Sequence, residues 1–378
     1  MSKARDIASA IPAPSTVSSA ELGYLDGVTS AIQTQINTKS AIADDFAAGK
    51  NKIINGDFGI NQRGFTSTTT SGTYIFDRFI VSNVDGTVTT TSQTFTLGAA
   101  PVAGYEATNF VQIVTTGQTL TTAQAVLQQR IESVRTLAGQ TATFSFWAKA
   151  NTGTPNINVT LAQGFGTGGS PSASVATTGT VQTITTSWAR YSFTISVPSI
   201  SGKTFGTNNN DYLAANIFVS GGSASSAPTV GIQSNTFQIW GVQVEAGSTA
   251  TAFQTATGTK QGELAACQRY YYRVTPVSTS KSFSLGQAYS TTNALGLLPF
   301  PVEMRTNPTA LEQSGTASNY GLSTANITFN DCTAVPVFNN ASVSMATFVF
   351  VSTGLVAGNA THFNARNNAA YLGWSAEL

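Results

Sequence analysis

Short runs of alternating apolar and polar residues dominate this chain from Asn51 onward. Stretches such as YIFDRFIVSN (74–83), TATFSFWAKA (141–150) and TFQIWGVQVEAG (236–247) show the pattern, and clusters of Gly, Ser, Pro and Asn separate them. A period of two places successive side chains on opposite faces of a strand, so each run predicts a strand with one buried face. Many short strands with turn residues between them are typical of β-sandwiches and β-barrels. The sequence therefore predicts a mainly β protein.

Gly258 and Gly262 flank a change in the pattern and divide the β-rich region in two. We expect residues 49–259 to form a jelly-roll-like β-sandwich. Residues 260–378 are expected to form a second, smaller β-sandwich that starts with a short helical turn at GELAACQRYY (262–271). The segment TAQAVLQQRIESVRTLAG (122–139) fits either a helix or two further strands.

The composition restricts the partners of this chain. Charged residues make up 9% of the sequence, against roughly 25% in ordinary soluble proteins, so hydroxyl and amide groups must form most of the surface. The formal charge is +1 and Lys and Arg do not cluster, which argues against nucleic acid as a partner, because phosphate binding needs clustered basic residues. No apolar run approaches the ~20 residues that span a bilayer, so we expect no membrane insertion.

The first residues, MSKARDIASAIPAPSTVSSAE, contain no continuous apolar segment and do not read as a secretory signal. We therefore expect folding in a reducing cytoplasm, with Cys267 and Cys332 as buried free thiols, although a disulfide between them stays open. The surface composition nevertheless suits a protein that acts outside the cell. Release by cell lysis would reconcile the two observations.

Residues 21–48 carry a different pattern, with a period of seven. If Leu22 is heptad position a, five of the eight a and d positions hold large apolar residues: Leu22, Leu25, Ile32, Ile36 and Phe46. Such a seam predicts an α-helical coiled coil. Thr29 and Lys39 interrupt the seam, so a free peptide should be mostly disordered and the helix should form where neighbouring domains hold copies together. The alternative is a single helix that packs on its own β-domain.

The sequence SSAELGYLDGVTSAIQTQI (18–36) resembles the stalk segments of bacteriophage tail-fibre proteins, which pack as parallel three-stranded bundles. This resemblance implies a homotrimer. NKIINGDFGINQRG (51–64), YIFDRF (74–79), TFSFWAKA (143–150) and IWGVQVEAGSTATAFQ (239–254) resemble, in order, the carbohydrate-binding-module-like jelly rolls of phage tail fibres. LPFPVEMRTNPTAL (298–311) and AAYLGWSAEL (369–378) resemble their C-terminal tip domains.

These resemblances imply a role and a set of partners. Residues 1–20 would attach the chain to a virion tail or an adaptor protein, and residues 260–378 would form a receptor-binding tip. The ligand would be a polysaccharide of the host surface, and the protein would be made in the host cytoplasm and released by lysis. Some relatives hold a structural calcium ion, for which Asp57 and Glu245 stand at matching positions. The alternative for both residues is a buried, hydrogen-bonded carboxylate.

Catalytic chemistry finds little support in the sequence. His362 is the one histidine, and GNATHFNARNN around it offers no carboxylate for a catalytic triad. Glycosidases need two positioned carboxyl groups, but the sequence pairs none of its candidates, and we expect Asp77 to form a salt bridge or turn beside Arg78. We therefore expect a binding protein without catalysis. A polysaccharide depolymerase and a structural virion component without a receptor are the alternatives.

Amide and aromatic side chains suit hydroxyl-rich ligands, and loops on a rigid sandwich commonly carry binding residues. We expect Trp147 and Trp240 to pack in the core, and Trp188, near a turn, to be more exposed. Trp374, in the last strand, could seal a subunit contact. The candidate glycan-binding residues are Trp188, Asn319, Tyr320, Asn339, Asn340, His362, Asn364, Arg366 and Asn367.

Overall fold

The structure, a computed structural model, describes residues 48–276, 281–324 and 329–378. The predicted attachment segment (1–20) and the coiled-coil seam of Leu22, Leu25, Ile32, Ile36 and Phe46 lie outside the described residues. The described part is mainly β, with a single α-helix, α4 (Lys260–Gln268), and two short 3-10 turns, η1 (Pro228–Val230) and η2 (Ala317–Asn319). No helix in this part combines the length and apolarity that a membrane span requires.

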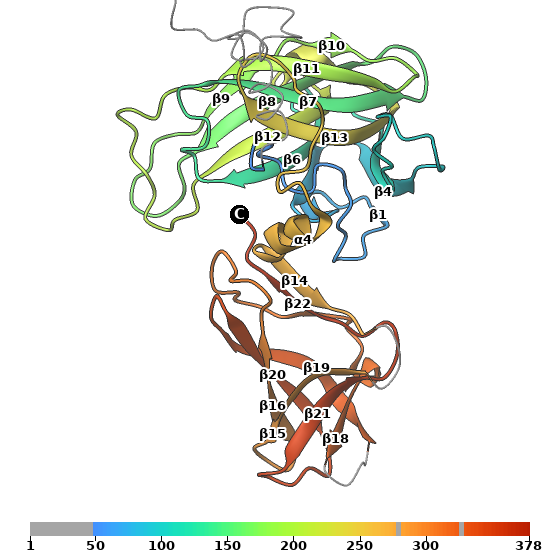
Figure 1. The fold of residues 1–378 in the computed structure, drawn as a ribbon, viewed down its shortest axis with the longest axis vertical. Coiled ribbons are helices and arrows are strands. Elements are labelled where there is room, and N and C mark those ends of the chain that lie inside the picture. Colours follow the sequence, from blue (N-terminus) through green and yellow to red (C-terminus); the bar gives the residue numbers. More distant parts are fainter. Residues whose placement is uncertain (1–47, 277–280, 325–328) are drawn as a thin grey trace, which may run out of the picture. The chain divides into compact units, whose positions relative to one another are not determined.

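Two antiparallel sheets form a β-sandwich from the first part of the chain (Figure 1). The six-stranded sheet has the order β1 (Ser67–Thr68), β4 (Thr87–Thr94), β5 (Asn109–Thr116), β13 (Thr236–Ala246), β7 (Thr141–Ala150), β11 (Ala189–Ser196). The seven-stranded sheet has the order β10 (Gln182–Thr183), β8 (Asn156–Gly164), β12 (Tyr212–Gly221), β6 (Gln124–Glu132), β3 (Phe79–Val84), β2 (Thr73–Tyr74), with β9 (Val175–Thr178) also paired to β8.

The sandwich core fills the space between these sheets. Alternate residues of each strand enter it, as period two predicts: Phe144 and Phe146 of β7 are fully buried and Phe193 of β11 stacks on Phe146 at a centroid distance of 5.9 Å. The ambiguous segment 122–139 contributes strand β6 and then a turn. Its pattern was hard to interpret because β6 has apolar residues on both faces: Leu127 enters the main core, and Val126 packs with Phe218 in a small separate cluster.

The short helical turn predicted near GELAACQRYY is confirmed as α4. Thr259 caps this helix, because its side-chain oxygen accepts a hydrogen bond from the backbone N–H of Gly262 at 3.1 Å. The chain then enters β14 (Tyr271–Val274), which pairs with β22 (Leu372–Ser375) and through it with β17 (Glu312–Gln313) in a three-stranded sheet.

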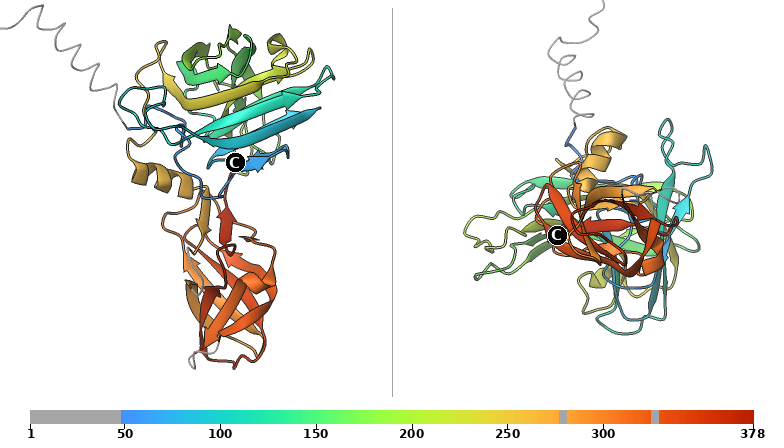
Figure 2. Two further views of the ribbon diagram at one scale, coloured as in Figure 1. Left: turned by 90° about the vertical axis from the view of Figure 1, so that its right-hand side faces the viewer. Right: turned by 90° about the horizontal axis from the view of Figure 1, so that it is seen from below.

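The prediction of a second sandwich was wrong, because the remaining strands close into a six-stranded barrel (Figure 2). Closure removes both sheet edges. Glycines make room for it: a Cβ at Gly296 would lie 2.6 Å from the ring of Phe348, and one at Gly286 would lie 2.6 Å from the ring of Phe363. The barrel order is β15 (Ser282–Ala288), β16 (Asn293–Pro299), β20 (Met345–Ser352), β19 (Phe329–Ala341), β18 (Tyr320–Thr324), β21 (Ala360–Ala365).

Candidate functional site

A row of hydrogen-bonded amide and hydroxyl side chains crosses the seven-stranded sheet of the sandwich. Gln128 of β6 lies opposite Asn216 of β12, which lies opposite Thr160 of β8. The Gln128 amide donates to Asn216 Oδ1 at 2.6 Å, and the Asn216 amide donates to Thr160 Oγ1 at 2.8 Å. Their sequence neighbours Leu127, Ile217 and Leu161 are in the core, so the row lies on the sheet face that points away from it.

The ends of this row reach solvent. Asn216 and Thr160 are buried and form its floor, whereas Gln128 is half-buried and the next residue across the sheet, Thr178 of β9, is exposed. Because amide and hydroxyl groups both donate and accept hydrogen bonds, the row can pair with groups of either kind.

A tyrosine and an arginine stand beside the row. The ring of Tyr212 lies close to Gly164 of β8, where a Cβ would come within 2.6 Å of it. The guanidinium carbon of Arg130 lies 4.6 Å from the centre of this ring, and Arg130 Nε donates to Gln128 Oε1 at 3.2 Å. Aromatic rings pack against apolar ligand surface and guanidinium groups donate hydrogen bonds. We call the set Gln128, Arg130, Thr160, Thr178, Tyr212 and Asn216 the amide face.

The tryptophans of the sandwich mainly pack. Trp240 is fully buried, as expected, and its ring centre lies 5.4 Å from that of half-buried Trp147. Trp188, predicted to be more exposed, is half-buried and lies 5.5 Å from both Phe95 and Phe110. It therefore supports the core and offers only part of its ring to a ligand. Trp374 is buried within the C-terminal part itself.

Three predicted glycan-binding residues are buried and were wrong as surface contacts: Asn319, Tyr320 and Asn364. The Tyr320 hydroxyl donates to the carbonyl of Tyr371 and accepts from the N–H of Ser314, both at 2.8 Å. The Asn364 amide donates to Ser323 Oγ at 2.9 Å. These groups stabilise the barrel because each buried polar atom has a partner.

The other candidates from the C-terminal part are spread over its surface. Asn339 and Asn340 are exposed on β19 and His362 is exposed on β21, with β18 between the two strands. Arg366 forms an ion pair with Asp331 at 2.7 Å, and the Asn367 amide donates to Asn319 Oδ1 at 2.6 Å. Through its backbone carbonyl, Asn319 also accepts a hydrogen bond from the N–H of Arg366 at 2.8 Å, but Asn339 and Asn340 lie on another strand, so the structure does not bring the predicted set into one site.

The residues that the resemblance implied as calcium ligands do not fit a metal site. Glu245 is fully buried and accepts hydrogen bonds from Gln243 Nε2, Thr251 N and Thr251 Oγ1 at 2.6 to 2.9 Å. Lys50 Nζ already lies 3.8 Å from this carboxylate. Asp57 does not share these partners; its carboxylate accepts a hydrogen bond from the Tyr105 hydroxyl at 2.7 Å. Within the described residues, no group of three His, Cys, Asp or Glu side chains could hold a metal ion. Hydrogen-bonded carboxylates, the alternative from the sequence, describe both residues better.

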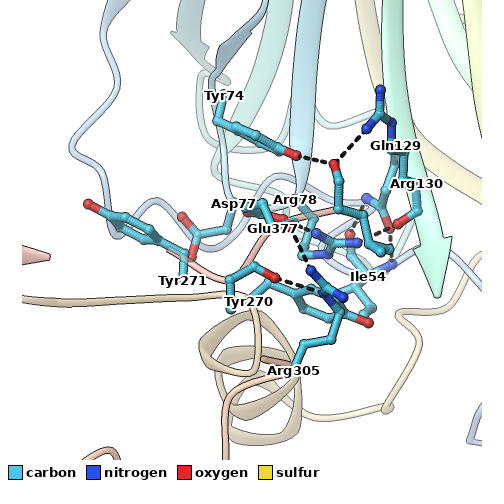
Figure 3. Close-up of polar contacts among 12 residues, drawn as sticks. Ile54, Tyr74, Asp77, Arg78, Gln129, Arg130, Tyr270, Tyr271, Arg305 and Glu377 are labelled. Atoms are coloured by element: carbon cyan, nitrogen blue, oxygen red, sulfur yellow. Dashed lines mark hydrogen bonds and ion pairs between the residues drawn. The ribbon is translucent and has the colours of Figure 1, made fainter. Parts of the chain in front are cut away.

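An arginine cluster that the sequence did not indicate surrounds Glu377 (Figure 3). Asp77 and Arg78 lie in a turn, which was one of the two expectations for this pair, but they form no salt bridge with each other; Asp77 accepts hydrogen bonds from Gln62, and burial raises the pKa of its carboxyl. Arg78 instead pairs with Glu377, and its guanidinium carbon lies 3.4 Å from the centre of the Tyr270 ring. No local pattern could reveal a pair so far apart in sequence.

No protein-family model and no curated protein sequence matches this chain. Among solved structures, it is similar to the enzymatically active domain of tailspike protein 4 of bacteriophage CBA120, with 16% identity and a TM-score of 0.29 over 52% of this chain. The chain spans 21% of the length of that domain. It is also similar to a putative sugar binding protein from Bacteroides thetaiotaomicron (15% identity, 52% of this chain, 100% of that chain, TM-score 0.34). A third similar structure is the family 11 carbohydrate-binding module of Clostridium thermocellum in complex with a mixed-linked tetrasaccharide (8% identity, 50% of this chain, 99% of that chain, TM-score 0.30). Likenesses at this level identify no function for this chain.

Proposed function

We propose that this protein is a non-catalytic, glycan-binding subunit of a homotrimeric phage tail fibre that attaches to a host cell-surface polysaccharide during adsorption. The amide face is the observation that carries the proposal. It joins donors and acceptors from neighbouring strands to a tyrosine ring. A sugar has the matching surface, with hydroxyls that donate and accept around a ring that bears C–H groups.

Each such contact contributes little, so one site should bind weakly. A hydrogen bond contributes about 0.5–1.5 kcal/mol, because it replaces one made to water. Three copies on one fibre would raise the apparent affinity through effective concentration without new contacts. This is how weak binding to a repeating polysaccharide becomes firm attachment.

Two observations support a homotrimer. The heptad seam of residues 21–48 would bring copies together, as in the stalk segments that residues 18–36 resemble. The second is the barrel surface: of the twelve large apolar side chains exposed in the described residues, eight belong to residues 281–378. Leu295, Val349 and Val337 lie side by side across β16, β20 and β19. We assign this strip to contact with further copies of the same chain.

The tail-fibre role is supported by the ordered set of resemblances along the chain. In this proposal residues 1–20 attach to the virion tail or an adaptor, and the protein acts in the virion after release by lysis. The low charge agrees with a surface that works outside the cell.

The test is binding of the full chain to a panel of purified bacterial capsular and O-chain polysaccharides, measured by biolayer interferometry. Tyr212→Ala and Gln128→Ala should each weaken binding to the polysaccharide that the native chain recognises by about 10-fold. Gln112→Ala is the matched control, because Gln112 is a half-buried glutamine that accepts from the Gln238 amide at 3.0 Å on the six-stranded sheet. Equal losses in all three variants would reject the amide face. Release of reducing ends by the native chain would replace the proposal by depolymerase activity.

A further inference from the structure

A pocket of about 360 Å³ opens in the C-terminal part of the chain, and no residue of the amide face lines it. Its walls come from the segment 306–312 and from residues 375–377. The first segment belongs to the MRTNPTAL stretch of the sequence. The volume lies near the lower end of the ~300–1,000 Å³ range of small-ligand sites.

The walls of this pocket are held in place. Arg305 Nε donates to the carbonyl of Ala376 at 2.8 Å and its Nη2 donates to the carbonyl of Glu377 at 2.9 Å. At the other end of the segment, Glu312 pairs with Gly373 in the β17–β22 ladder. Pro308 is buried between these two anchors. A loop fixed at both ends and in the middle offers a preformed site, which lowers the entropy cost of binding.

Four polar side chains of the pocket are not used by the fold. Thr306, Asn307 and Thr309 are exposed and Ser375 is half-buried, and among the described residues the side chains of all four take part in no hydrogen bond. Glu312 accepts one hydrogen bond, from the Tyr271 hydroxyl at 2.8 Å. Since a carboxylate has about four acceptor positions, most of its capacity remains available. The pocket therefore presents three hydroxyls, an amide and a carboxylate to an incoming molecule.

The arrangement favours a neutral ligand rich in hydroxyl groups. The two carboxylates, Glu312 and Glu377, disfavour an anion, and the charge of Glu377 is already balanced by Arg78 and Arg63. A calcium ion needs six to eight oxygen ligands, several of them usually carboxylates, and the described residues hold no group of three acidic or other metal-binding side chains.

We infer that this pocket binds a single sugar residue through its hydroxyl groups, as a second glycan subsite of the chain. This inference rests on the proposed glycan-binding function and adds a site to it. Because no aromatic side chain lines the pocket, hydrogen bonds alone would hold the sugar. Binding of one monosaccharide should accordingly be weak, in the millimolar range.

The experiment is saturation-transfer NMR on the full chain with the methyl glycosides of glucose, galactose, mannose and N-acetylglucosamine. At least one should give a signal that Thr309→Val and Asn307→Ala each reduce several-fold. Thr316→Val is the matched control, because Thr316 is also exposed in the C-terminal part and its side chain makes no hydrogen bond within the described chain. Unchanged thermal unfolding of all three variants shows that the fold is intact.

The outcomes separate this inference from the proposed function. A signal that persists in both pocket variants, or that the control reduces equally, overturns the pocket as a sugar site. If polysaccharide binding is lost in Tyr212→Ala while the pocket variants change nothing, the pocket fails and the amide face stands. Conversely, a pocket-dependent sugar signal supports the pocket even if the amide-face variants leave polysaccharide binding unchanged. The inference is also overturned if no glycoside gives a signal and the native chain binds calcium ions in a titration with calcium chloride, while the Thr309→Val variant does not.

Discussion

Arg78 forms an ion pair with Glu377, a residue 299 positions later in the sequence. Only 1% of the Arg78 side chain and 5% of the Glu377 side chain is exposed. Arg63 Nη1 also lies 3.4 Å from Glu377. The hydroxyl of Tyr74, a residue labelled in Figure 3, donates to the carbonyl of neighbouring Leu378 at 3.1 Å. The end of the described chain is thus tied to residues of the sandwich by buried charged groups.

Glu377→Gln should be strongly destabilising, because it leaves the Arg78 charge buried without a partner. Removing one member of a buried ion pair costs about 3–5 kcal/mol, which guanidinium unfolding would measure as a lower midpoint. Glu303→Gln is the control, since Glu303 is exposed and forms no ion pair among the described residues. The double variant Arg78→Met with Glu377→Gln should recover part of the stability that Glu377→Gln loses. Equal midpoints for Glu377→Gln and Glu303→Gln would contradict a stabilising role for the Arg78–Glu377 pair.

Glu132 should make the free energy of unfolding fall at acid pH. Burial raises the pKa of its carboxyl, but hydrogen bonds from Arg269 and Tyr270 outweigh burial and hold it below the ordinary value of 4.5. A carboxylate with a lowered pKa stabilises the fold above about pH 4.5, and this contribution is lost as pH falls through its folded-state pKa. Glu132→Gln should cost less than about 1 kcal/mol at neutral pH, because solvent screens this partly exposed pair, and the cost should be smaller at about pH 3. Unfolding midpoints at both pH values test this, and an equal loss at both would contradict it.

Gly241 occupies a bulge in β13 that only glycine fits. Its φ is +67°, and a Cβ would lie 2.7 Å from Trp147 Cε3. Gly241→Ala should lower stability by about 2–4 kcal/mol, through backbone strain and overpacking together. Gly231→Ala separates the two causes, since Gly231 has a φ of +81° and a Cβ added there would meet nothing within 4 Å. Equal thermal shifts in the two variants would show that the contact with Trp147 contributes nothing.

Light scattering tests the assembly. The full chain should have three times the 39.3 kDa of one copy, about 118 kDa. If the barrel strip contributes to assembly, Leu295→Glu should increase dissociation in a chain that lacks residues 1–47, because Leu295 belongs to the strip and is 36% exposed on β16. Leu97→Glu, at an 89% exposed leucine of the sandwich, is the control. A monomeric full chain would exclude the homotrimer.

Cys267 and Cys332 should be unreactive in the folded protein. Both are free and buried; burial raises the pKa of Cys267 well above its ordinary value and that of Cys332 to about 12. Since the thiolate is the reactive form, Ellman's reagent at mildly alkaline pH should label neither thiol until denaturant is added, and then both. Labelling that requires prior reduction would instead indicate a disulfide.

Local sequence patterns determined the strands of this protein and its one described α-helix. Alternation predicted β7 and β13, and Gly258 with Gly262 marked the boundary where Thr259 caps α4. These features depend on neighbouring residues, so the sequence carries them directly. The same local reasoning left β6 undecided, because burial on both faces of a strand hides its period.

Only the tertiary structure decided that the barrel closes, which side chains are exposed and which distant residues pair. The C-terminal strands close into a barrel because β15 pairs with β21, which lies far along the chain. That closure buries Tyr320, which was predicted from the sequence to contact a glycan. Gln128, Asn216 and Thr160 meet only when three strands align, and Arg78 meets Glu377 rather than its neighbour Asp77. Contacts of this kind depend on long-range registry, which leaves no periodic trace in the residues that make them.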